Sequence, residues 1–530
     1  MGKTQVRATL LATTAVLTII ASANAGPNLV GDPSFESGAF SAAAGRWQNT
    51  GGSGFNSLSN IGALANSGAF VFSGGCTGVG CVATSVANGV TGAGSISQSI
   101  NLQPGIYQGS FFYRSAGGTP NALAASLGQG SQHNIVVPLQ TDIPTNPNYQ
   151  RFSFVSAAAG GTTTLALGIR NLPAFDFIDD VRLELVDDGE GNNIGAAAQT
   201  VAVQASREFL DRLQDRFNHA GSPIRMASVR ETVVASAGGM SYVNASGKYR
   251  AFMSVFGSDG EWDDSAASAE RRGFSAGIEA NVGSLDIGAA FSLSRTDFDT
   301  QTIFTQNEGE AEEMLGAIYA HWSPSSTPVY FNLIAGYGQS TSDLTRTAFF
   351  DLGLDGLLDS NRAQDVDSSQ WFASAEIGFD WAVSPSFMLT PFARVDGAML
   401  EQDGYAEVQF ATSSLPIAVV AGRDFDALRS IVGVRAGLDL DIGRGGKLGA
   451  KVGWAHDFEQ DRFVTFTEST GPVSFAGVAG AATPAEDSVV AGASIELAVS
   501  DQAAVYAGYN GDFADEQEIH AGEVGLRVTW

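Results

Sequence analysis

The sequence predicts an all-β protein: an N-terminal β-sandwich, a helical linker, and a C-terminal twelve-stranded antiparallel transmembrane β-barrel with the helix in its pore. Three observations predict this. Apolar and polar residues alternate strictly toward the C-terminus, the chain opens with an export signal, and a helical pattern precedes the alternating segments. The expected divisions are 1–25, 26–188, 189–240 and 241–530.

Composition limits the class of partner. The 530 residues include 28 Lys and Arg against 56 Asp and Glu, a formal net charge of −28. Binding to nucleic acid needs a basic face that neutralises phosphates, so we exclude nucleic acid as a partner. With only two Cys and five His, the sequence offers no Cys-rich zinc or iron–sulfur site and no expected His-based metal site.

Residues 1–25 have the pattern of a secretory signal peptide. Lys3 and Arg7 precede an apolar stretch over 8–20, and Ala23-Asn24-Ala25 provides a small-residue cleavage site. About 13 apolar residues are too few to span a bilayer as a helix, and no later run reaches 18. We therefore expect an exported chain that is periplasmic, secreted or built as an outer-membrane barrel.

Residues 26–188 predict a β-sandwich of short strands. They are rich in Gly, Ser, Ala and Asn, and turn signals such as Gln103-Pro104-Gly105 separate the β-type runs. The runs lie at 68–73, 95–101, 105–114, 135–139, 150–155, 162–170 and 175–186.

A helix is predicted over 195–219. Phe209, Leu210, Leu213 and Phe217 form one apolar stripe, while nearby Arg residues make this segment basic within an acidic protein. Twenty-five residues rise about 37 Å, enough to cross the thickness of a membrane. A basic helix would match an acidic-lined lumen, and an ordinary interdomain helix is the alternative.

The end of the chain carries the barrel pattern most clearly. Val524, Leu526, Val528 and Trp530 form an apolar row that ends in an aromatic residue, and small or charged residues alternate with them. Similar segments recur upstream to about twelve strands, an even number as in single-chain outer-membrane barrels. Long polar loops are expected at 296–310, 341–369, 403–426 and 458–487.

The second face of these strands predicts a wet, charged lumen. A soluble sandwich also alternates, but its inner face collects bulky apolar residues instead of charges. The residues expected to point into the pore are Glu279, Glu376, Arg394, Arg435, Lys451, Glu496, Glu523 and Arg527.

These features together resemble the autotransporter (type V secretion) family over residues 195–530. The segments that carry the resemblance are 391–393, 428–435, 505–509 and the terminal 522–530. The resemblance implies a monomer in the outer-membrane bilayer, with the N-terminal segment at the cell surface and the helix left in the pore. It also implies use of the general export and barrel-assembly machinery.

The N-terminal part resembles jelly rolls of the carbohydrate-binding-module class. Residues 28–38 open the part, 95–100 lie centrally, and 175–185 close it. The resemblance implies a glycan or other cell-surface ligand, and it puts Glu36 and Asp180 where a structural Ca²⁺ would be held by oxygen ligands. Turn capping by Asp180 is the alternative, and we expect no other cofactor.

Two residue pairs suggest covalent chemistry. Cys76 and Cys81 would meet an oxidising compartment after export, so we expect a short disulfide loop. Some autotransporters cleave themselves at an Asn pair in the pore, and the resemblance implies the same for Asn192 and Asn193.

We expect no enzymatic activity. Gly273-Phe274-Ser275-Ala276-Gly277 fits a nucleophile-elbow pattern but lies in a regular strand, and Pro33 occupies the nucleophile position of an esterase-like Gly31-Asp32-Pro33-Ser34. The alternatives are a secreted carbohydrate-active or esterase-type hydrolase and a porin-like outer-membrane channel.

Overall fold

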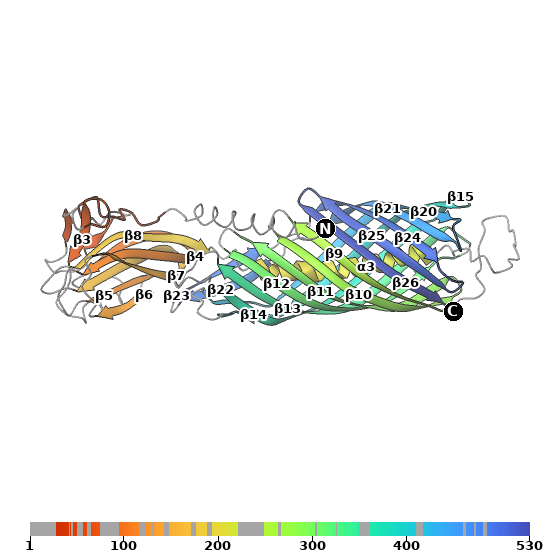
Figure 1. The fold of residues 1–530 in the computed structure, drawn as a ribbon, viewed down its shortest axis with the longest axis horizontal. Helices are drawn as coiled ribbons and strands as arrows, with labels where there is room; N and C mark the ends of the chain where they lie inside the picture. Colours follow the sequence, from red (N-terminus) through yellow and green to blue (C-terminus); the bar gives the residue numbers. More distant parts are fainter. Residues whose placement is uncertain are drawn as a thin grey trace, which may run out of the picture.

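In the computed structural model, an N-terminal sheet lies at one end of a long β-barrel (Figure 1). The structure describes residues 28–41, 43, 46–49, 57–60, 65–74, 95–115, 122–129, 132–141, 148–170, 176–187, 193–220, 249–262, 267–302, 305–324, 326–348, 360–409, 417–458, 463–470, 473–480 and 485–530. The predicted signal peptide, Cys76, Cys81 and Asn192 lie outside these residues.

The barrel closes as a ring of twelve antiparallel strands among the described residues, which confirms the predicted architecture. The ring closes because the last strand pairs with the first, from Gln517↔Trp262 to Thr529↔Arg250. In order around the ring the strands are β9 (Tyr249–Trp262), β10 (Ala267–Val282), β11 (Leu285–Gln301), β12 (Thr305–Trp322), β13 (Val329–Ala348), β14 (Ser360–Phe379), β16 (Phe387–Gln402), β20 (Arg423–Leu440), β21 (Gly446–Asp457), β24 (Asp487–Ala498), β25 (Ala503–Ala514) and β26 (Gln517–Thr529).

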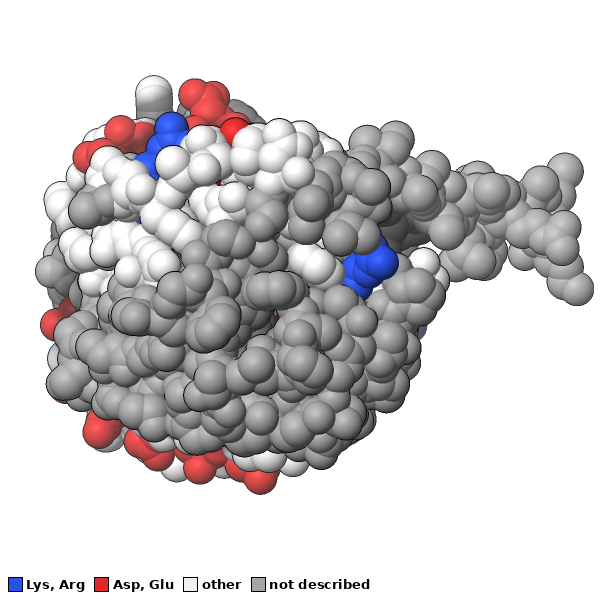
Figure 2. Space-filling view, turned by 90° about the vertical axis from the view of Figure 1, so that its left-hand side faces the viewer, with Lys and Arg blue, Asp and Glu red and all other residues white. Residues whose placement is uncertain are grey.

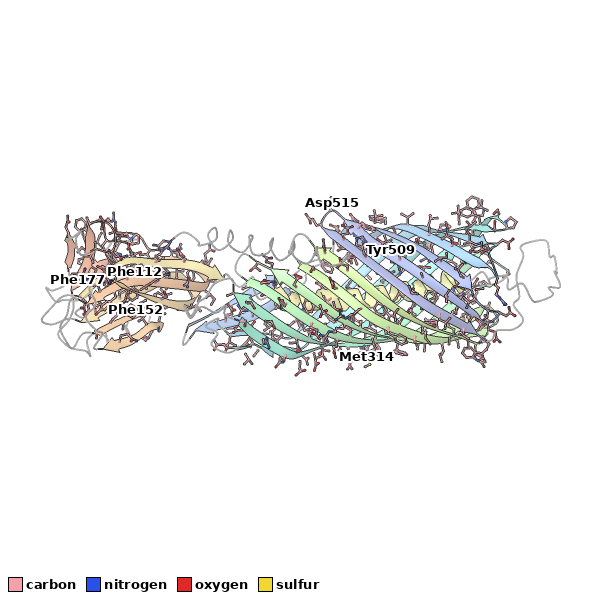
Figure 3. All side chains as sticks on the ribbon, viewed as in Figure 1. Phe112, Phe152, Phe177, Met314, Tyr509 and Asp515 are labelled. Carbon is pink, nitrogen blue, oxygen red and sulfur yellow. The ribbon has the colours of Figure 1, made fainter. Side chains whose placement is uncertain are left out.

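The wall follows the alternation of the sequence. Along β13 buried and exposed residues alternate almost without a break, so Leu333 points outward while Asn332 and Ile334 point inward. Figure 3 shows Met314 of β12 directed away from the barrel. Exposed apolar side chains on the outside suit contact with lipid, and polar ones inside suit water.

The strands are longer than a bilayer requires, which corrects two of the predicted loops. A membrane-crossing strand needs about 9–11 residues, yet β12 has 18 and β13 has 20. The predicted loop at 296–310 is mostly strand, because β11 runs to Gln301 and β12 starts at Thr305. In the predicted loop at 341–369, β13 runs to Ala348 and β14 starts at Ser360. Glu308, Glu310 and Glu312 of β12 lie at outward positions beyond the apolar band. A strand can continue to pair where its outer residues are polar. The first charged outer residues therefore show where the lipid-facing band ends, and the strand itself continues beyond them.

Glycine lets aromatic rings lie flat against the inner wall. Gly336 of β13 faces Phe372 of β14 in register, and a Cβ on Gly336 would collide with that ring. The same pairing recurs at Gly273–Phe256, Gly277–Phe252, Gly288–Tyr319, Gly309–Phe298, Gly378–Tyr330, Gly433–Phe392 and Gly525–Tyr506.

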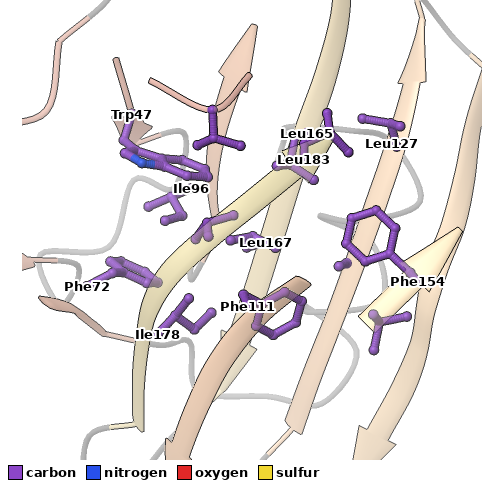
Figure 4. Close-up of a cluster of buried hydrophobic side chains, with 14 of the residues drawn as sticks. Trp47, Phe72, Ile96, Phe111, Leu127, Phe154, Leu165, Leu167, Ile178 and Leu183 are labelled. Carbon is purple, nitrogen blue, oxygen red and sulfur yellow. The ribbon is translucent and has the colours of Figure 1, made fainter. Parts of the chain in front are cut away.

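The N-terminal part is an eight-stranded sheet in the order β2-β3-β8-β4-β7-β5-β6, with β1 paired to β4. Its core joins Trp47, Phe72, Ile96, Phe111 and Leu167, among others (Figure 4). The predicted jelly-roll arrangement stays a prediction. The strands are β1 (Gln48–Asn49), β2 (Ser57–Asn60), β3 (Phe70–Gly74), β4 (Ser95–Ser115), β5 (Ala122–Gln129), β6 (Gln132–Thr141), β7 (Gln150–Arg170) and β8 (Asp176–Asp187).

Two of the predicted polar loops form a small sheet. β17 (Tyr405–Ala406), β19 (Ile417–Val420), β22 (Phe463–Thr470) and β23 (Val473–Gly480) pair in that order, and we call them the loop sheet. The prediction of plain loops at 403–426 and 458–487 was wrong here, because buried apolar residues recur at every second position of β19 and β22 and so give each strand one buried side. Short β15 (Trp381–Ser384) and β18 (Val408–Gln409) extend the barrel sheet.

Helix α3 (Ile194–Ala220) lies inside the ring, as predicted (Figure 1). It contacts β11, β12, β13, β14 and β16. Among the described residues, no helix is both long and apolar enough to cross a membrane.

Candidate functional site

The candidate site is the barrel lumen together with the helix that fills it. The apolar stripe of α3 packs against the aromatic inner wall: Phe209, Leu210 and Leu213 share one buried cluster with Phe252 and Phe372. The rings of Phe209 and Phe372 meet edge to face, with centroids 6.1 Å apart. The helix therefore fits a surface that glycine-backed rings have shaped.

Hydrogen bonds hold the start of the helix. The carboxamide oxygen of Asn193 accepts from Thr300 Oγ1 at 2.7 Å and from Asn307 Nδ2 at 3.0 Å. Nearly two turns later, Gln199 donates to Gln402 at 2.8 Å. Gly195 is needed at this end because a Cβ there would collide with the Tyr405 hydroxyl.

A buried charge cluster pins the middle of the helix. Arg271 of β10 donates to Glu208 of the helix at 2.8 Å and to Glu313 of β12 at 3.1 Å. It also donates to the Val201 carbonyl at 2.7 Å. The side chains of Arg271, Glu208 and Glu313 are only 3%, 5% and 0% exposed, so water screens these pairs little. Arg207 of the helix pairs with Asp457 of β21.

Further ion pairs follow toward the inner end of the helix. Arg394 of β16 donates to Asp211 at 2.5 Å and to Asp396 at 2.7 Å. Lys451 of β21 lies 3.1 Å from Asp215. Charged groups thus hold successive turns of the helix to different strands, so both its register and its rotation are fixed.

Two helix arginines lie over rings of the wall. The guanidinium of Arg212 is 3.6 Å from the centre of the Phe256 ring, and that of Arg216 is 3.3 Å from Phe252. Such cation–π contacts are stronger when they are shielded from water. They attach the basic side of the helix to β9, the strand that follows the linker.

The structure puts all eight predicted pore charges on the inner side of the wall, each in an ion pair. Glu376 and Arg435 pair through both nitrogens at 2.7 Å. Glu279 pairs with Arg250 at 3.0 Å. The remaining pairs are Arg394 with Asp211, Lys451 with Asp215, Glu496 with Arg527, and Glu523 with Arg216.

The expected match of a basic helix with an acidic lumen needs correction. Wall cations Arg271, Arg394 and Lys451 bind helix acids, so the pairing runs in both directions. The sequence did not single out Arg271 and Glu313 as pore charges. Both nevertheless occupy inward-facing positions in the alternation of their strands. Beside the last turns of the helix a cavity remains, lined in part by Asp215, Glu279, Tyr330, Arg435, Lys451, Glu496 and Glu523.

The terminal strand closes the seam of the barrel. Val524 and Trp530 are 59% and 52% exposed on the outer face, and Leu526 and Val528 are half-buried. Trp530 and Tyr249 exchange backbone hydrogen bonds at 3.0 and 3.1 Å, with ring centroids 6.3 Å apart. The last residue of the chain is thus bonded to the first residue of the ring.

Acidic residues tie the first segment of the N-terminal sheet to the start of β3 and to β8, its last strand. Glu36 accepts from the backbone N–H groups of Ala69 and Phe70, and Asp180 accepts from Ser34 and Asn66. Among the described residues, no group of three or more His, Cys, Asp or Glu is arranged to hold a metal ion. The calcium site at Glu36 and Asp180 stays a prediction, as does cleavage at the Asn pair.

The pKa values of two neighbouring carboxyl groups of this sheet, Asp179 and Asp180, are shifted in opposite directions. Burial raises the pKa of Asp179 to about 6, although backbone N–H groups of Ser67, Asp180 and Asn66 oppose the shift. Burial alone would also raise the pKa of Asp180, but hydrogen bonds from Ser34, Ser67 and Asn66 lower it.

Comparison with known proteins agrees with this architecture. Residues 251–510 match the family model described as autotransporter beta-domain. No curated protein matches the chain. The chain is similar to the translocator domain of the autotransporter NalP from Neisseria meningitidis, with 15% identity, a TM-score of 0.44, and coverage of 63% of this chain and 100% of that one.

Two further solved structures are similar. The β-domain of the Bordetella autotransporter BrkA is 18% identical, with a TM-score of 0.37 and coverage of 53% and 100%. TmCBM61 in complex with β-1,4-galactotriose is 18% identical, with a TM-score of 0.22 and coverage of 30% of this chain and 98% of that one. The family match over residues 251–510 identifies the C-terminal barrel of this chain as an autotransporter β-domain, an outer-membrane translocator of the family that displays its passenger at the cell surface.

Proposed function

We propose that the protein displays residues 26–188 outside the cell as a passenger that binds glycans. The observation that carries the proposal is a mixed aromatic and polar face on the N-terminal sheet. Phe112, Arg114 and Tyr149 lie half-buried on this face, and Arg151, which faces Phe112 in register, is exposed. We call these four residues the polar face. Glycan sites combine rings that stack on sugars with side chains that hydrogen-bond hydroxyl groups.

Sheet geometry separates the polar face from the core. Side chains alternate along β4, so Phe111 and Tyr113 join the core while Phe112 and Arg114 point the other way. Figure 3 shows Phe112 and Phe152 in this sheet. The guanidinium groups of Arg114 and Arg151 supply hydrogen-bond donors on this face.

The charge of the surrounding surface favours an uncharged ligand over a strongly anionic polymer. On the described part of the end that carries the sheet, acidic side chains outnumber basic ones (Figure 2). An uncharged saccharide would not be repelled by this surface, whereas a strongly anionic polymer would be. We also propose that the chain is a monomer, reaches the membrane through the general export and barrel-assembly machinery, and acts by display without turnover.

Binding of the full-length protein to a glycan array tests the proposal. Detergent-solubilised protein should bind a subset of neutral saccharides, and Arg151→Ala or Phe112→Ala should abolish that binding. Asn101→Ala provides the matched control, because Asn101 is an exposed residue of the same strand outside the polar face. An array without signal, or equal loss in all three variants, would remove the proposal of glycan binding and leave the translocator assignment intact.

A further inference from the structure

The loop sheet connects the N-terminal sheet with the barrel. It comes from two connections of the barrel, β16 to β20 and β21 to β24. Strand β22 is central, since it pairs with β19 through Val420↔Phe466 and with β23 along its whole length. In Figure 1, β22 and β23 lie between the end of the barrel and the ends of β4 and β7.

A buried ion cluster fixes the loop sheet to the barrel rim. Arg346, near the end of β13, binds Glu407 through two nitrogens at 2.9 and 2.7 Å and Glu468 of β22 at 2.6 Å. The side chains of Arg346 and Glu468 are fully buried, and Asn361 of β14 also donates to Glu407. Bidentate pairs of this kind fix orientation as well as distance. The loop sheet is therefore held in one position relative to the pore.

The N-terminal sheet rests on this fixed surface. Ile106 of β4 and Ala157 of β7, which face each other in register, are buried in one apolar cluster with Val464 and Phe466 of β22 and Ala479 of β23. The cluster continues to Ala196 of the helix and Ala348 of β13. Neither Ile106 nor Ala157 belongs to the core of the N-terminal sheet. Their burial thus depends on contact with the rest of the molecule.

Only one face of β22 is apolar. Val464, Phe466 and Glu468 are buried, while Thr465 and Thr467 between them are exposed. Rings and aliphatic side chains at the outer end of a membrane barrel would be in water if nothing covered them, which is unfavourable. The N-terminal sheet contributes Ile106 and Ala157 to the apolar cluster that covers them, beside Ala196 of the helix and Ala348 of β13.

We propose that the loop sheet is a docking surface that holds the folded passenger on the cell independently of the peptide link. The occupant is the part of the N-terminal sheet around Ile106 of β4 and Ala157 of β7 in the same chain. Retention follows from burial of Ile106 and Ala157 against β22 and β23, with Arg346 keeping the surface rigid. A passenger whose linker has been cut then stays attached to the barrel.

Controlled cleavage on intact cells tests this docking. A site for a sequence-specific protease is inserted between residues 187 and 193, the protease is added, and passenger in the supernatant is compared with passenger on the cells. We expect retention in the parent and release raised at least about tenfold by Ile106→Asp, the change that loss of one buried apolar contact produces. Thr467→Asp, on the exposed face of β22, is the matched control and should retain the passenger.

A second variant on the barrel side distinguishes loss of docking from misfolding of the passenger. Phe466→Asp alters the docking surface without changing the passenger, and heat-modifiable gel mobility reports whether the barrel has assembled. Resistance of the released fragment to further digestion reports whether the passenger is folded. Release of folded passenger by Ile106→Asp and Phe466→Asp, but not by Thr467→Asp, supports docking. Release from the cleaved parent, or retention in both Asp variants with the barrel assembled, overturns it.

Discussion

Removal of the Arg271 guanidinium should loosen the helix from the pore. In Arg271→Met, Glu208 and Glu313 lose the cation that binds both, and the Val201 carbonyl loses its donor. Arg212, at 3.7 Å from Glu208, compensates only in part. Loss of one partner of a buried ion pair costs about 3–5 kcal/mol, and we take the lower figure because the lumen is polar. About 3 kcal/mol raises the population of displaced helix about a hundredfold.

Single-channel conductance in planar bilayers measures this displacement. Arg271→Met should open frequently, whereas the parent should stay almost closed. Arg272→Met is the matched control, since Arg272 is the next residue but points outward and is 68% exposed. Equal conductance of the two variants in barrels that keep heat-modifiable mobility would refute the view that buried pairs hold the helix in place.

Three further predictions concern packing, acidity and redox state. Gly336→Ala should reduce barrel assembly on gels by forcing the facing ring away, at a cost of about 1–3 kcal/mol; Gly316→Ala, whose added methyl has 4.0 Å of clearance, should assemble normally. Since the pKa of Asp179 is raised from 3.8 to about 6, its contribution to passenger stability should be greatest below about pH 4 and be lost as the pH rises to about 6. The difference in melting temperature between the parent and Asp179→Asn measures this contribution; a difference that stays constant or grows over this range would contradict it. Cys76 and Cys81 should resist alkylation until reduced, as mass spectrometry of exported protein would show.

Barrel identity was readable from the sequence because a strand has a period of two. A lipid-facing wall with a wet lumen imposes opposite polarity on successive residues. The outward direction of Val524 and Trp530 and the inward direction of Glu523 can therefore be predicted without knowing which residues surround them. The apolar stripe around Phe209 predicted the pore helix in the same way. The sequence did not predict the outer ends of the strands. Acidic residues such as Glu310 are equally compatible with a loop and with a strand that continues beyond the lipid.

What the sequence by itself determined is the class of each segment: alternation gave the strands, and the helical stripe gave α3. Only the tertiary structure decided which distant residues meet, such as Arg271 with Glu208 and Arg346 with Glu468, since these pairs depend on strand register and helix rotation. It alone also brought Ile106 against the loop sheet. Local periodicity is set by backbone geometry within a few residues, whereas such contacts arise only when the ring has closed around the helix.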